Sequence, residues 1–353
     1  MMKIDTPRGD TRQVLDTDQV LRPASGIRIR PRPGGDLHIG SDTVHGLLLR
    51  DAPVEAAGVV AAATDGLPLS AWWRRERLDP DFWTPVFQQL LAAGLLVPAT
   101  AGAIRPPGAD LRGEHGFLTH RHGPAAAERA LQARADALVV VQGSGPAAVA
   151  VAAQLAVAGV GHVHPRPDRS DRHRQGPGGD DEGRRLVALV RGASPTVRAH
   201  APAAHVPPVL TVLVDGGPVD PGLAAELTQA GLPHLVLQVR TTRAVVGPLV
   251  LPGRTSCLLC ADRHRADADP HWMIERPEPW APPVPTVLVH AAAARAAHET
   301  LEFLDGLVAP ATLDGTLEWT TAGAGPRRRT WRRHPDCGCG ATGPGPSTAP
   351  GPR

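Results

Sequence analysis

The sequence predicts an α/β protein in which a domain with buried parallel strands follows a small winged-helix-like α+β domain. An apolar run at 137–141 leads into a glycine turn and then an Ala-rich helix pattern, the order typical of a βαβ unit with a buried parallel strand. Later apolar runs alternate with helix patterns as far as residue 251. Before residue 100, three short strand patterns precede three helix patterns. These observations define the fold class.

The first domain is expected over residues 24–103. Residues 1–23 are polar and aperiodic, so we expect a disordered tail there. Short alternating patterns, with a Gly34-Gly35 turn between the first two, predict strands at 27–33, 36–40 and 44–50. Apolar residues at helical spacing predict helices at 52–64, 67–77 and 81–99. This order of elements fits a winged-helix-like domain.

A Pro/Gly-rich stretch predicts a linker at 104–123, and the second domain is expected over 124–340. Apolar runs in that domain predict strands at 137–142, 159–165, 209–215, 233–239 and 245–251. Helix patterns separate them at 124–135, 146–157, 181–195 and 221–233. The polar stretch 164–183 is expected to be a mobile loop. Residues 341–353 contain mainly Gly, Pro, Ser and Ala, so we expect a second disordered tail.

Composition excludes several classes of function. Lys+Arg 37 against Asp+Glu 35 gives a net charge of +2, so no overall field favours nucleic acid. The arginine run around Trp331 is interpreted as an exposed strand face and not as an RNA site. The chain has no Asn, and Lys3 is its one Lys, which excludes a Lys-bearing phosphate loop, a pyridoxal Schiff base and a Cys-His-Asn triad. Without a long apolar segment or a signal-peptide core, we expect a cytoplasmic protein that does not contact membranes.

The cysteines form the strongest chemical motif. Cys257 and Cys260 form a CxxC pair, and Cys337 and Cys339 form a CxC pair, which together use every cysteine in the chain. Each pair offers two soft ligands to one tetrahedral Zn²⁺ if the fold brings the pairs together, and four thiolates leave no open position. We therefore expect a structural zinc ion. The alternatives are a disulfide, unrelated buried thiols or an oxidoreductase CxxC, although the motif lacks thioredoxin-like context.

A glycine turn follows the first strand of the second domain and is typical of a phosphate-binding turn. The candidate nucleotide-binding residues of this turn are Gly143, Ser144, Gly145 and Ala148. At the end of the next strand, where a ribose-binding acid is expected, the chain has His162, His164 and Pro165, and Asp168 comes later. The dinucleotide interpretation therefore lacks one of its required residues.

Two further groups of residues leave alternatives open. Asp215 ends an apolar strand, where a carboxylate can hold Mg²⁺ in the ligand crevice of an α/β sheet or can simply begin a turn. His264, His271 and His334 lie near the cysteines in the sequence, and they are either additional metal ligands or loop histidines.

The glycine turn, the strand-end Asp and the two cysteine pairs resemble those of the ThiF/MoeB adenylyltransferases, which are related to ubiquitin-activating enzymes. The resemblance runs from about residue 137 to residue 340. It implies a Rossmann-like, ThiF-type sheet with a zinc knuckle, a homodimer, and activation of a C-terminal carboxylate with MgATP.

By this resemblance, Gly143 and Gly145 match the phosphate glycines and Ala148 stands at the third glycine position. Asp215 matches the Mg²⁺-associated Asp, and Arg174 matches the Arg of an Asn-Leu-x-Arg-Gln segment whose Asn and Leu are missing here. Arg184 or Arg185 replaces the phosphate-contacting Lys, and the ribose Asp is absent. These losses affect ATP contacts selectively, which implies a retained fold with weakened or lost catalysis.

The first domain resembles the PqqD-like element that recognises precursor peptides and often precedes a degenerate ThiF-like domain in ribosomal peptide pathways. The resemblance extends to the leader-binding half of azole-forming cyclodehydratases, which act with a YcaO-type partner. It implies that a leader peptide adds as a strand beside residues 44–50 and rests on an apolar groove. The peptide-binding candidates are Val44, Leu47, Leu49, Arg50, Phe87, Leu90 and Leu91. The alternative for the apolar members is an ordinary winged-helix core.

The sequence therefore supports two main hypotheses. The first is a zinc-stapled scaffold that binds a precursor leader peptide and presents it to a modifying enzyme in thiazole/oxazole-type, bacteriocin-like biosynthesis. The second is an active adenylyltransferase in which arginine replaces the usual Lys, a change that is not conservative because the guanidinium is broader and planar. A redox or regulatory protein with an unrelated Rossmann-like domain is the remaining alternative.

Overall fold

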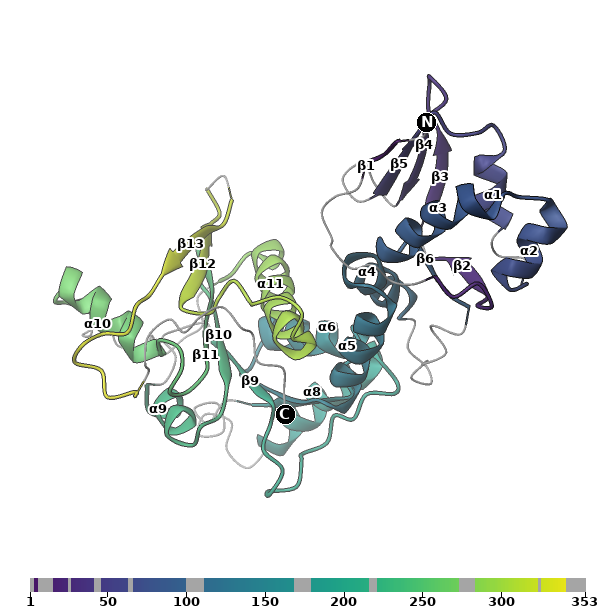
Figure 1. Ribbon diagram of the computed structural model, residues 1–353. Coiled ribbons are helices and arrows are strands. Elements are labelled where there is room, and N and C mark those ends of the chain that lie inside the picture. The colour runs from purple at the N-terminus through teal and green to yellow at the C-terminus, as the bar shows by residue number, and fades with distance from the viewer. Residues whose placement is uncertain are drawn as a thin grey trace. The chain divides into compact units, whose positions relative to one another are not determined.

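A computed structural model describes most of the chain and divides it into two compact units (Figure 1). The described residues are 3–5, 15–24, 27–40, 46–62, 66–99, 111–167, 179–215, 221–272, 283–322 and 325–340. The first unit comprises Met1–Arg105 and Asp110–Leu131, and the second comprises Pro106–Ala109 and Gln132–Arg353.

The first unit contains a four-stranded antiparallel sheet in the order β1-β5-β4-β3. Its strands are β1 (Lys3–Asp5), β3 (Arg28–Pro31), β4 (Leu37–Gly40) and β5 (Gly46–Arg50). Gly34 and Gly35 connect β3 to β4 with φ values of 88° and 83°, a backbone region that glycine adopts without steric cost. The Gly-Gly turn predicted from the sequence therefore lies where the chain must reverse.

Three helices pack with this sheet around an aromatic core. They are α1 (Ala56–Ala62), α2 (Leu69–Glu76) and α3 (Pro80–Ala92). Phe87 lies at the centre of the core, with its ring centroid 5.9 Å from Trp72, 6.0 Å from Trp73 and 6.3 Å from Trp83. A two-stranded ladder of β2 (Leu21–Pro23) and β6 (Leu96–Pro98) completes the strands among the described residues of this unit.

The boundaries of the first unit differ from the expected ones. The third predicted helix ends at Ala92 because Gly94 adopts a positive φ of 66°, and β6 follows. Helix α4 (Arg112–His122) lies within the expected linker 104–123, and α5 (Pro124–Asp136) comes next. Strands β1 and β2 lie within 1–23, the segment expected to be a tail.

The second unit contains a seven-stranded mixed sheet in the order β13-β12-β11-β10-β9-β7-β8. Its strands are β7 (Leu138–Gln142), β8 (His162–Arg166), β9 (Leu210–Asp215), β10 (His234–Val239), β11 (Arg243–Val250), β12 (Gly315–Thr320) and β13 (Arg327–Thr330). The strands from β8 to β10 are parallel, and β11 to β13 are antiparallel. The last strand, β13, is exposed as expected, but Trp331 directly after it is buried.

Helices cover both faces of this sheet. They are α6 (Pro146–Val157), α8 (Gly179–Ala193), α9 (Pro221–Gln229), α10 (Leu258–Ala268) and α11 (Thr286–Asp305). Alternate strand residues point to opposite faces. Val212 and Leu235 pack with α6, α8 and α11, whereas Leu213 and Val236 pack with α9 and α10.

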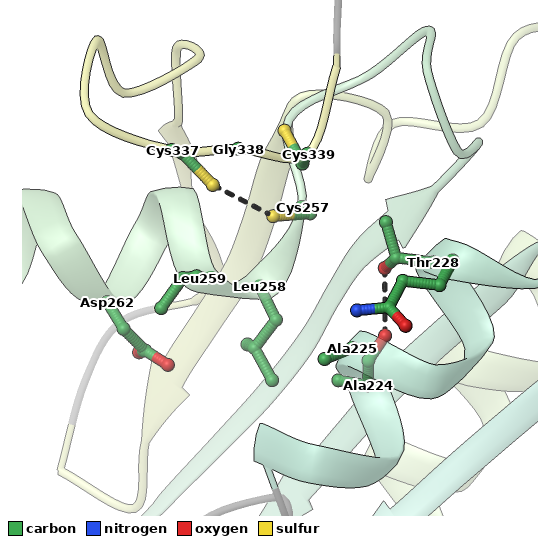
Figure 2. A pocket seen from close by; sticks show the side chains of 11 residues that line it. Ala224, Ala225, Thr228, Cys257, Leu258, Leu259, Asp262, Cys337, Gly338 and Cys339 are labelled. Carbon is green, nitrogen blue, oxygen red and sulfur yellow. Dashed lines mark hydrogen bonds between the residues drawn. The ribbon is translucent and has the colours of Figure 1, made fainter.

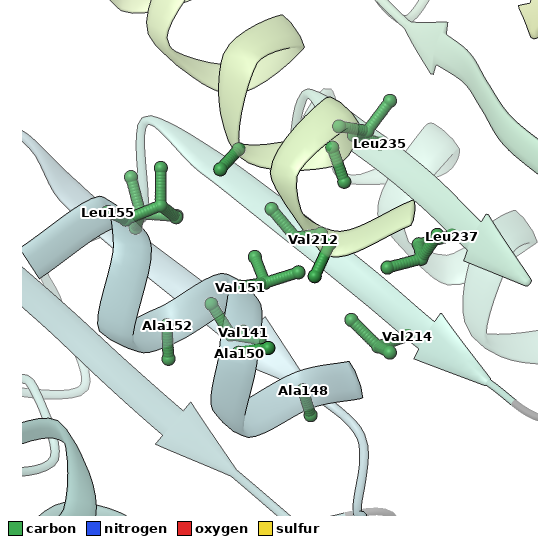
Figure 3. Packing of buried hydrophobic residues seen from close by; sticks show 14 of the residues in the cluster. Val141, Ala148, Ala150, Val151, Ala152, Leu155, Val212, Val214, Leu235 and Leu237 are labelled. Atoms are coloured by element: carbon green, nitrogen blue, oxygen red, sulfur yellow. The ribbon is translucent and has the colours of Figure 1, made fainter. Parts of the chain in front are cut away.

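The main core of the second unit lies between the parallel strands, α6 and α11. Figure 3 shows Val151 and Leu155 of α6 beside Val141, Val212 and Leu237 of the sheet. All of these side chains have an exposed fraction of 0%. The small residues of α6 and α11 let these helices pack closely together.

The expected mixed α/β class with a parallel-rich sheet is confirmed. Strand β8 lies on one side of β7, whereas the next strand in the chain, β9, lies on the other side. In such sheets a ligand crevice usually forms at the carboxyl ends of the two strands where the order reverses, here β7 and β9. In the described part of the chain, no helix has both the length and the apolar character needed to cross a bilayer.

Candidate functional site

The two cysteine pairs meet at one point of the second unit. The Sγ atoms of Cys257 and Cys337 lie 3.6 Å apart, those of Cys260 and Cys339 lie 3.6 Å apart, and those of Cys257 and Cys260 lie 3.7 Å apart. These distances exclude disulfide bonds, in which the sulfurs are about 2 Å apart. They match the spacing of about 3.8 Å that a tetrahedron with metal–sulfur bonds of about 2.3 Å requires. The four thiols can therefore hold a metal ion.

Local structure explains how the pairs are positioned. Cys257 is the N-cap residue of α10, so Cys260 follows within the first turn. The backbone N–H of Ser256 donates to Asp314 Oδ1 at 2.7 Å, which fixes the approach to α10. The loop with Cys337 and Cys339 begins after β13, a strand added to the sheet beside β12. The fold therefore brings together pairs about 80 residues apart in the sequence.

The sulfurs differ in their tendency to ionise. Cys257 donates to Cys260, and this hydrogen bond raises the pKa of the Cys257 thiol and lowers the pKa of Cys260 to about 4. Burial raises the pKa of Cys337 to about 11. Without a metal, Cys260 therefore ionises more readily than Cys257 and Cys337, and metal binding would release the protons of these two thiols.

A second group of metal-ligating residue types, His264, Asp267 and His334, lies beside the cysteine cluster. His334 is buried, its Nε2 lies 3.0 Å from Asp267 Oδ2, and its Nδ1 accepts from the backbone N–H of Asp336 at 3.1 Å. The ring of His264 contacts the His334 ring. Because both ring nitrogens of His334 are engaged, the histidine shapes the loop that carries Cys337.

A cavity of about 380 Å³ opens beside the cluster (Figure 2). Ala224, Ala225 and Thr228 of α9 line one side, and Leu258 and Leu259 of α10 line the other. The lining of the cavity is mostly apolar, and Asp262 contributes a carboxylate to it. Sequence reasoning missed the cavity because its residues come from two helices and a distant loop.

The glycine turn lies between β7 and α6 as expected, but its two glycines have different roles. A Cβ on Gly143 would lie 2.1 Å from the carbonyl oxygen of Val214, so packing against β9 requires glycine there. Gly145 has a φ of 84° and open space where a Cβ would be. Ser144 is half-buried, and Ala148 is buried in the core. Of the two glycines, Gly145 alone leaves room beside the N-terminus of α6.

The remaining nucleotide candidates do not form one group. Arg185 is largely exposed and lies 3.8 Å from Glu182 of its own helix, whereas Arg184 lines a separate cavity. Asp215 is the last residue of β9, and its side chain is outside the described part of the structure. Arg174 also lies outside the described residues.

The structure places most of the peptide-binding candidates in the core of the first unit. The side chains of Leu47, Leu49, Phe87 and Leu90 are 0% exposed, and Leu91 is 9% exposed. These side chains therefore do not line an open groove, because three tryptophans and the sheet cover them. Arg50 is exposed at the end of β5, and Val44 lies outside the described residues.

The backbone edge of β5 remains relevant to peptide binding. On one side β5 pairs with β4, and on the other it pairs with β1, a segment of three residues. The partners of Leu48, Leu49 and Arg50 are Asp5, Ile4 and Lys3. This edge of β5 therefore accepts an antiparallel strand from a segment that is distant in the sequence.

Comparison with known proteins gives a match at the level of structure. No protein-family model matches the sequence, and no curated protein does. The structures of E. coli MccB with ATP and with selenomethionine-labelled MccA each give a TM-score of 0.63 at 14% identity, covering 91% of this chain and 99% of theirs. The chain has the MccB fold. This is a fold of the ThiF-like type, as the sequence motifs predict.

The MccB fold accounts for both units, because 91% of the chain is covered. A heterocyclase in complex with substrate and cofactor is also similar, with a TM-score of 0.59 and 13% identity. That match covers 92% of this chain and 40% of the heterocyclase chain. This chain therefore spans less than half of the length of that heterocyclase.

Proposed function

We propose that this protein binds the leader of a ribosomally made precursor peptide and presents the peptide to a modifying enzyme. The partner would be a YcaO-type cyclodehydratase, and the product a thiazole- or oxazole-containing, bacteriocin-like peptide. Two likenesses support a role in peptide modification. MccB, a microcin C7 biosynthetic enzyme, has been solved in complex with N-formylated MccA, and the similar heterocyclase has been solved with its substrate.

The edge of β5 is the observation that carries this proposal. An extended peptide can add to an exposed strand through main-chain hydrogen bonds, and this mode needs no open apolar groove. Strand β1 already adds to β5 in the antiparallel direction. We propose that the leader takes the place of β1 beside β5, so that residues 24–103 act as the peptide-recognition domain.

In this proposal the second unit is a scaffold held by zinc. A four-thiolate site with no open position suits a structural Zn²⁺ and not a catalytic one. The ion would join the start of α10 to the loop after β13, and it would leave the chemistry of the reaction to the partner enzyme.

Hydrogen exchange on the full-length protein tests the proposal. The probe is a synthetic leader of a candidate precursor peptide, added without nucleotide. Binding should speed exchange of the displaced β1 amides (Lys3–Asp5) and leave those of Leu48–Arg50 protected, because the leader would take over the pairing of β1 with β5. Binding that leaves exchange of the β1 amides unchanged would contradict strand addition in the place of β1, and absence of binding would contradict the proposal as a whole.

Adenylyl transfer is the second candidate, because the β7–α6 turn retains an open Gly145 at a helix N-terminus and MccB has been solved with ATP. Such an enzyme would catalyse exchange of pyrophosphate into ATP in the presence of its carboxylate substrate. Replacing Asp215 by Ala should abolish that exchange. Exchange by the parent protein that Asp215→Ala removes would favour this candidate over the scaffold.

A further inference from the structure

A second cavity of the second unit, of about 790 Å³, lies at the carboxyl end of β8. Its walls come from β8, from the residues after it and from one side of α8. The charged and polar side chains that line it are those of His164, Arg166, Arg184 and Arg191. A volume of several hundred cubic ångströms is the size of cavity that nucleotides and similar ligands occupy.

The cavity is positively charged. Its lining, within the described part of the chain, includes three guanidinium groups and no carboxylate. Arg184 contacts Asp181 on the exposed surface of α8, so its charge is partly compensated. Arg166 is half-buried and Arg191 is exposed. Burial and then the charge of Arg166 lower the pKa of His164, which agrees with a positive potential at this position.

The position of Arg166 relates this cavity to the glycine turn. Arg166 is the register partner of Gln142, the last residue of β7. The backbone N–H of Gly143 donates to the Arg166 carbonyl oxygen at 2.9 Å. The arginine-lined cavity therefore begins one residue from the turn that leads into α6. A ligand that extends from the cavity past Arg166 would meet this turn next.

Dinucleotide-binding folds use the end of this strand to recognise the ribose. An acidic residue there accepts a hydrogen bond from the ribose hydroxyl, whereas an arginine accommodates a phosphate on the ribose. In this chain β8 ends in Arg166, and Arg191 faces the same cavity from α8. Guanidinium groups form paired, charge-assisted hydrogen bonds with phosphate oxygens.

We propose that this cavity binds a nucleotide that carries a phosphate on its ribose, with Arg166 and Arg191 contacting that phosphate. In this proposal, the missing ribose-binding acid changes which nucleotide is preferred, from one with a free ribose hydroxyl to one with a phosphate on the ribose. It does not only weaken nucleotide binding. This inference goes beyond leader binding and does not depend on it, because the ligand and the unit involved are different.

Calorimetry on the full-length protein tests the inference with adenosine 2′,5′-bisphosphate, adenosine 3′,5′-bisphosphate and AMP as probes. At least one bisphosphate should bind about tenfold or more tightly than AMP, since the added phosphate would form charge-assisted hydrogen bonds. Arg191→Gln, on the exposed surface of α8, should remove most of that preference, and so should Arg166→Gln. Arg254→Gln, in an exposed turn outside the cavity, should retain it.

Three outcomes would overturn the inference. The first is equal binding of the bisphosphates and AMP, or no binding of either. The second is a preference that persists in both cavity variants. The third is inorganic phosphate that binds as tightly as the bisphosphates, which would reduce the cavity to a simple anion site. Thermal unfolding of each variant separates loss of binding from loss of folding. No peptide is present, so failure here would leave the leader proposal untouched.

Discussion

Arg134 and Asp305 form a bidentate salt bridge although they lie 171 positions apart in the sequence. The Arg134 Nε and Nη2 atoms donate to the two carboxylate oxygens of Asp305 at 2.6 and 2.7 Å. Both side chains are almost fully buried, at 3% and 8% exposed. Nη1 of the same arginine donates to the Ala158 carbonyl oxygen at 3.1 Å. One guanidinium therefore joins the ends of α5, α6 and α11.

Replacing Asp305 by Ala should strongly destabilise the second unit. The change leaves a buried guanidinium without its counter-charge, which typically costs about 3–5 kcal/mol in the free energy of unfolding. Denaturant titration measures this cost. Asp181→Ala is the matched control, because its pair with Arg184 is exposed and should contribute less than about 1 kcal/mol. Equal stabilities of the two variants would contradict the structural role of the buried pair.

Alanine substitutions in the glycine turn should have unequal effects on folding. Gly143→Ala places a Cβ against the Val214 carbonyl oxygen and should lower the unfolding midpoint markedly. Gly145→Ala meets open space and should cost only about 1–2 kcal/mol, for the positive φ. Thermal unfolding compares the two. A larger loss of stability for Gly145→Ala than for Gly143→Ala would be inconsistent with the close packing of Gly143 against β9. Loss of ligand binding in Gly143→Ala alone would therefore not identify a nucleotide contact.

Replacing Cys257 by Ser should remove the metal from the cluster. We expect the parent protein to contain about one zinc ion per chain, and the variant to contain far less, because a hydroxyl is a poor replacement for a thiolate ligand. Elemental analysis measures the metal, and thermal unfolding should show a lower midpoint. Ser256→Ala is the control, since the Ser256 hydroxyl has no hydrogen-bond partner among the described residues. Unchanged metal content in Cys257→Ser would exclude the four-cysteine site.

Acid should destabilise the second unit in part through His234. This residue of β10 is 0% exposed, and its Nδ1 lies 3.0 Å from the Leu232 carbonyl oxygen. Burial lowers the pKa of His234. The unfolded chain, with a histidine pKa of about 6.5, therefore binds the proton more readily than the folded chain. The free energy of unfolding should then fall below about pH 6.5, by at most about 1.4 kcal/mol per pH unit for this histidine, down to its folded pKa.

Denaturant titrations between pH 7.5 and 5.5 measure this dependence. His234→Gln should flatten the slope without removing it, because burial also lowers the pKa of His162 and His164. The control His205→Gln, at an exposed position, should keep the parent slope. If the free energy of unfolding of His234→Gln depends on pH as steeply as that of the parent protein, the buried imidazole does not titrate on unfolding.

Deleting residues 1–14 should increase leader affinity if the leader replaces β1. The leader would no longer compete with an internal strand, and each 1.4 kcal/mol of competition removed gives about tenfold tighter binding. Fluorescence anisotropy with a labelled leader measures the change. Deletion of residues 341–353 is the control and should leave affinity unchanged. Weaker binding after the N-terminal deletion would indicate that these residues help to hold the leader.

The cysteine cluster and the parallel strands could be predicted because their signals are chemical or periodic. Cys257 and Cys337 belong to two short-spaced pairs that together use every cysteine. The apolar runs at 209–215 and 233–239 correspond to β9 and β10, since strands buried on both faces are continuously apolar. Such patterns are independent of the detailed packing of neighbouring elements.

The features that sequence reasoning missed depend on contacts between distant residues. The three residues of β1 have no periodic pattern, and their strand is defined by pairing with β5. Helix α4 contains Gly113 and Gly116, which disfavour helix, and the burial of Leu118 compensates. From the sequence alone, Phe87 could line a binding groove or belong to the core. The contacts of its ring with three tryptophan rings show that it belongs to the core.

The separation of the two cysteine pairs also sets the order of events during synthesis. Cys257 leaves the ribosome about 80 residues before Cys337, which corresponds to roughly 4–16 s at typical elongation rates. During that interval the first pair can hold a metal with only two protein ligands. Strands β12 and β13 are made in the same interval, so the edge of the sheet has been synthesised before the metal site can close. A metal acquired early would thus be exchangeable, and one acquired late would be retained.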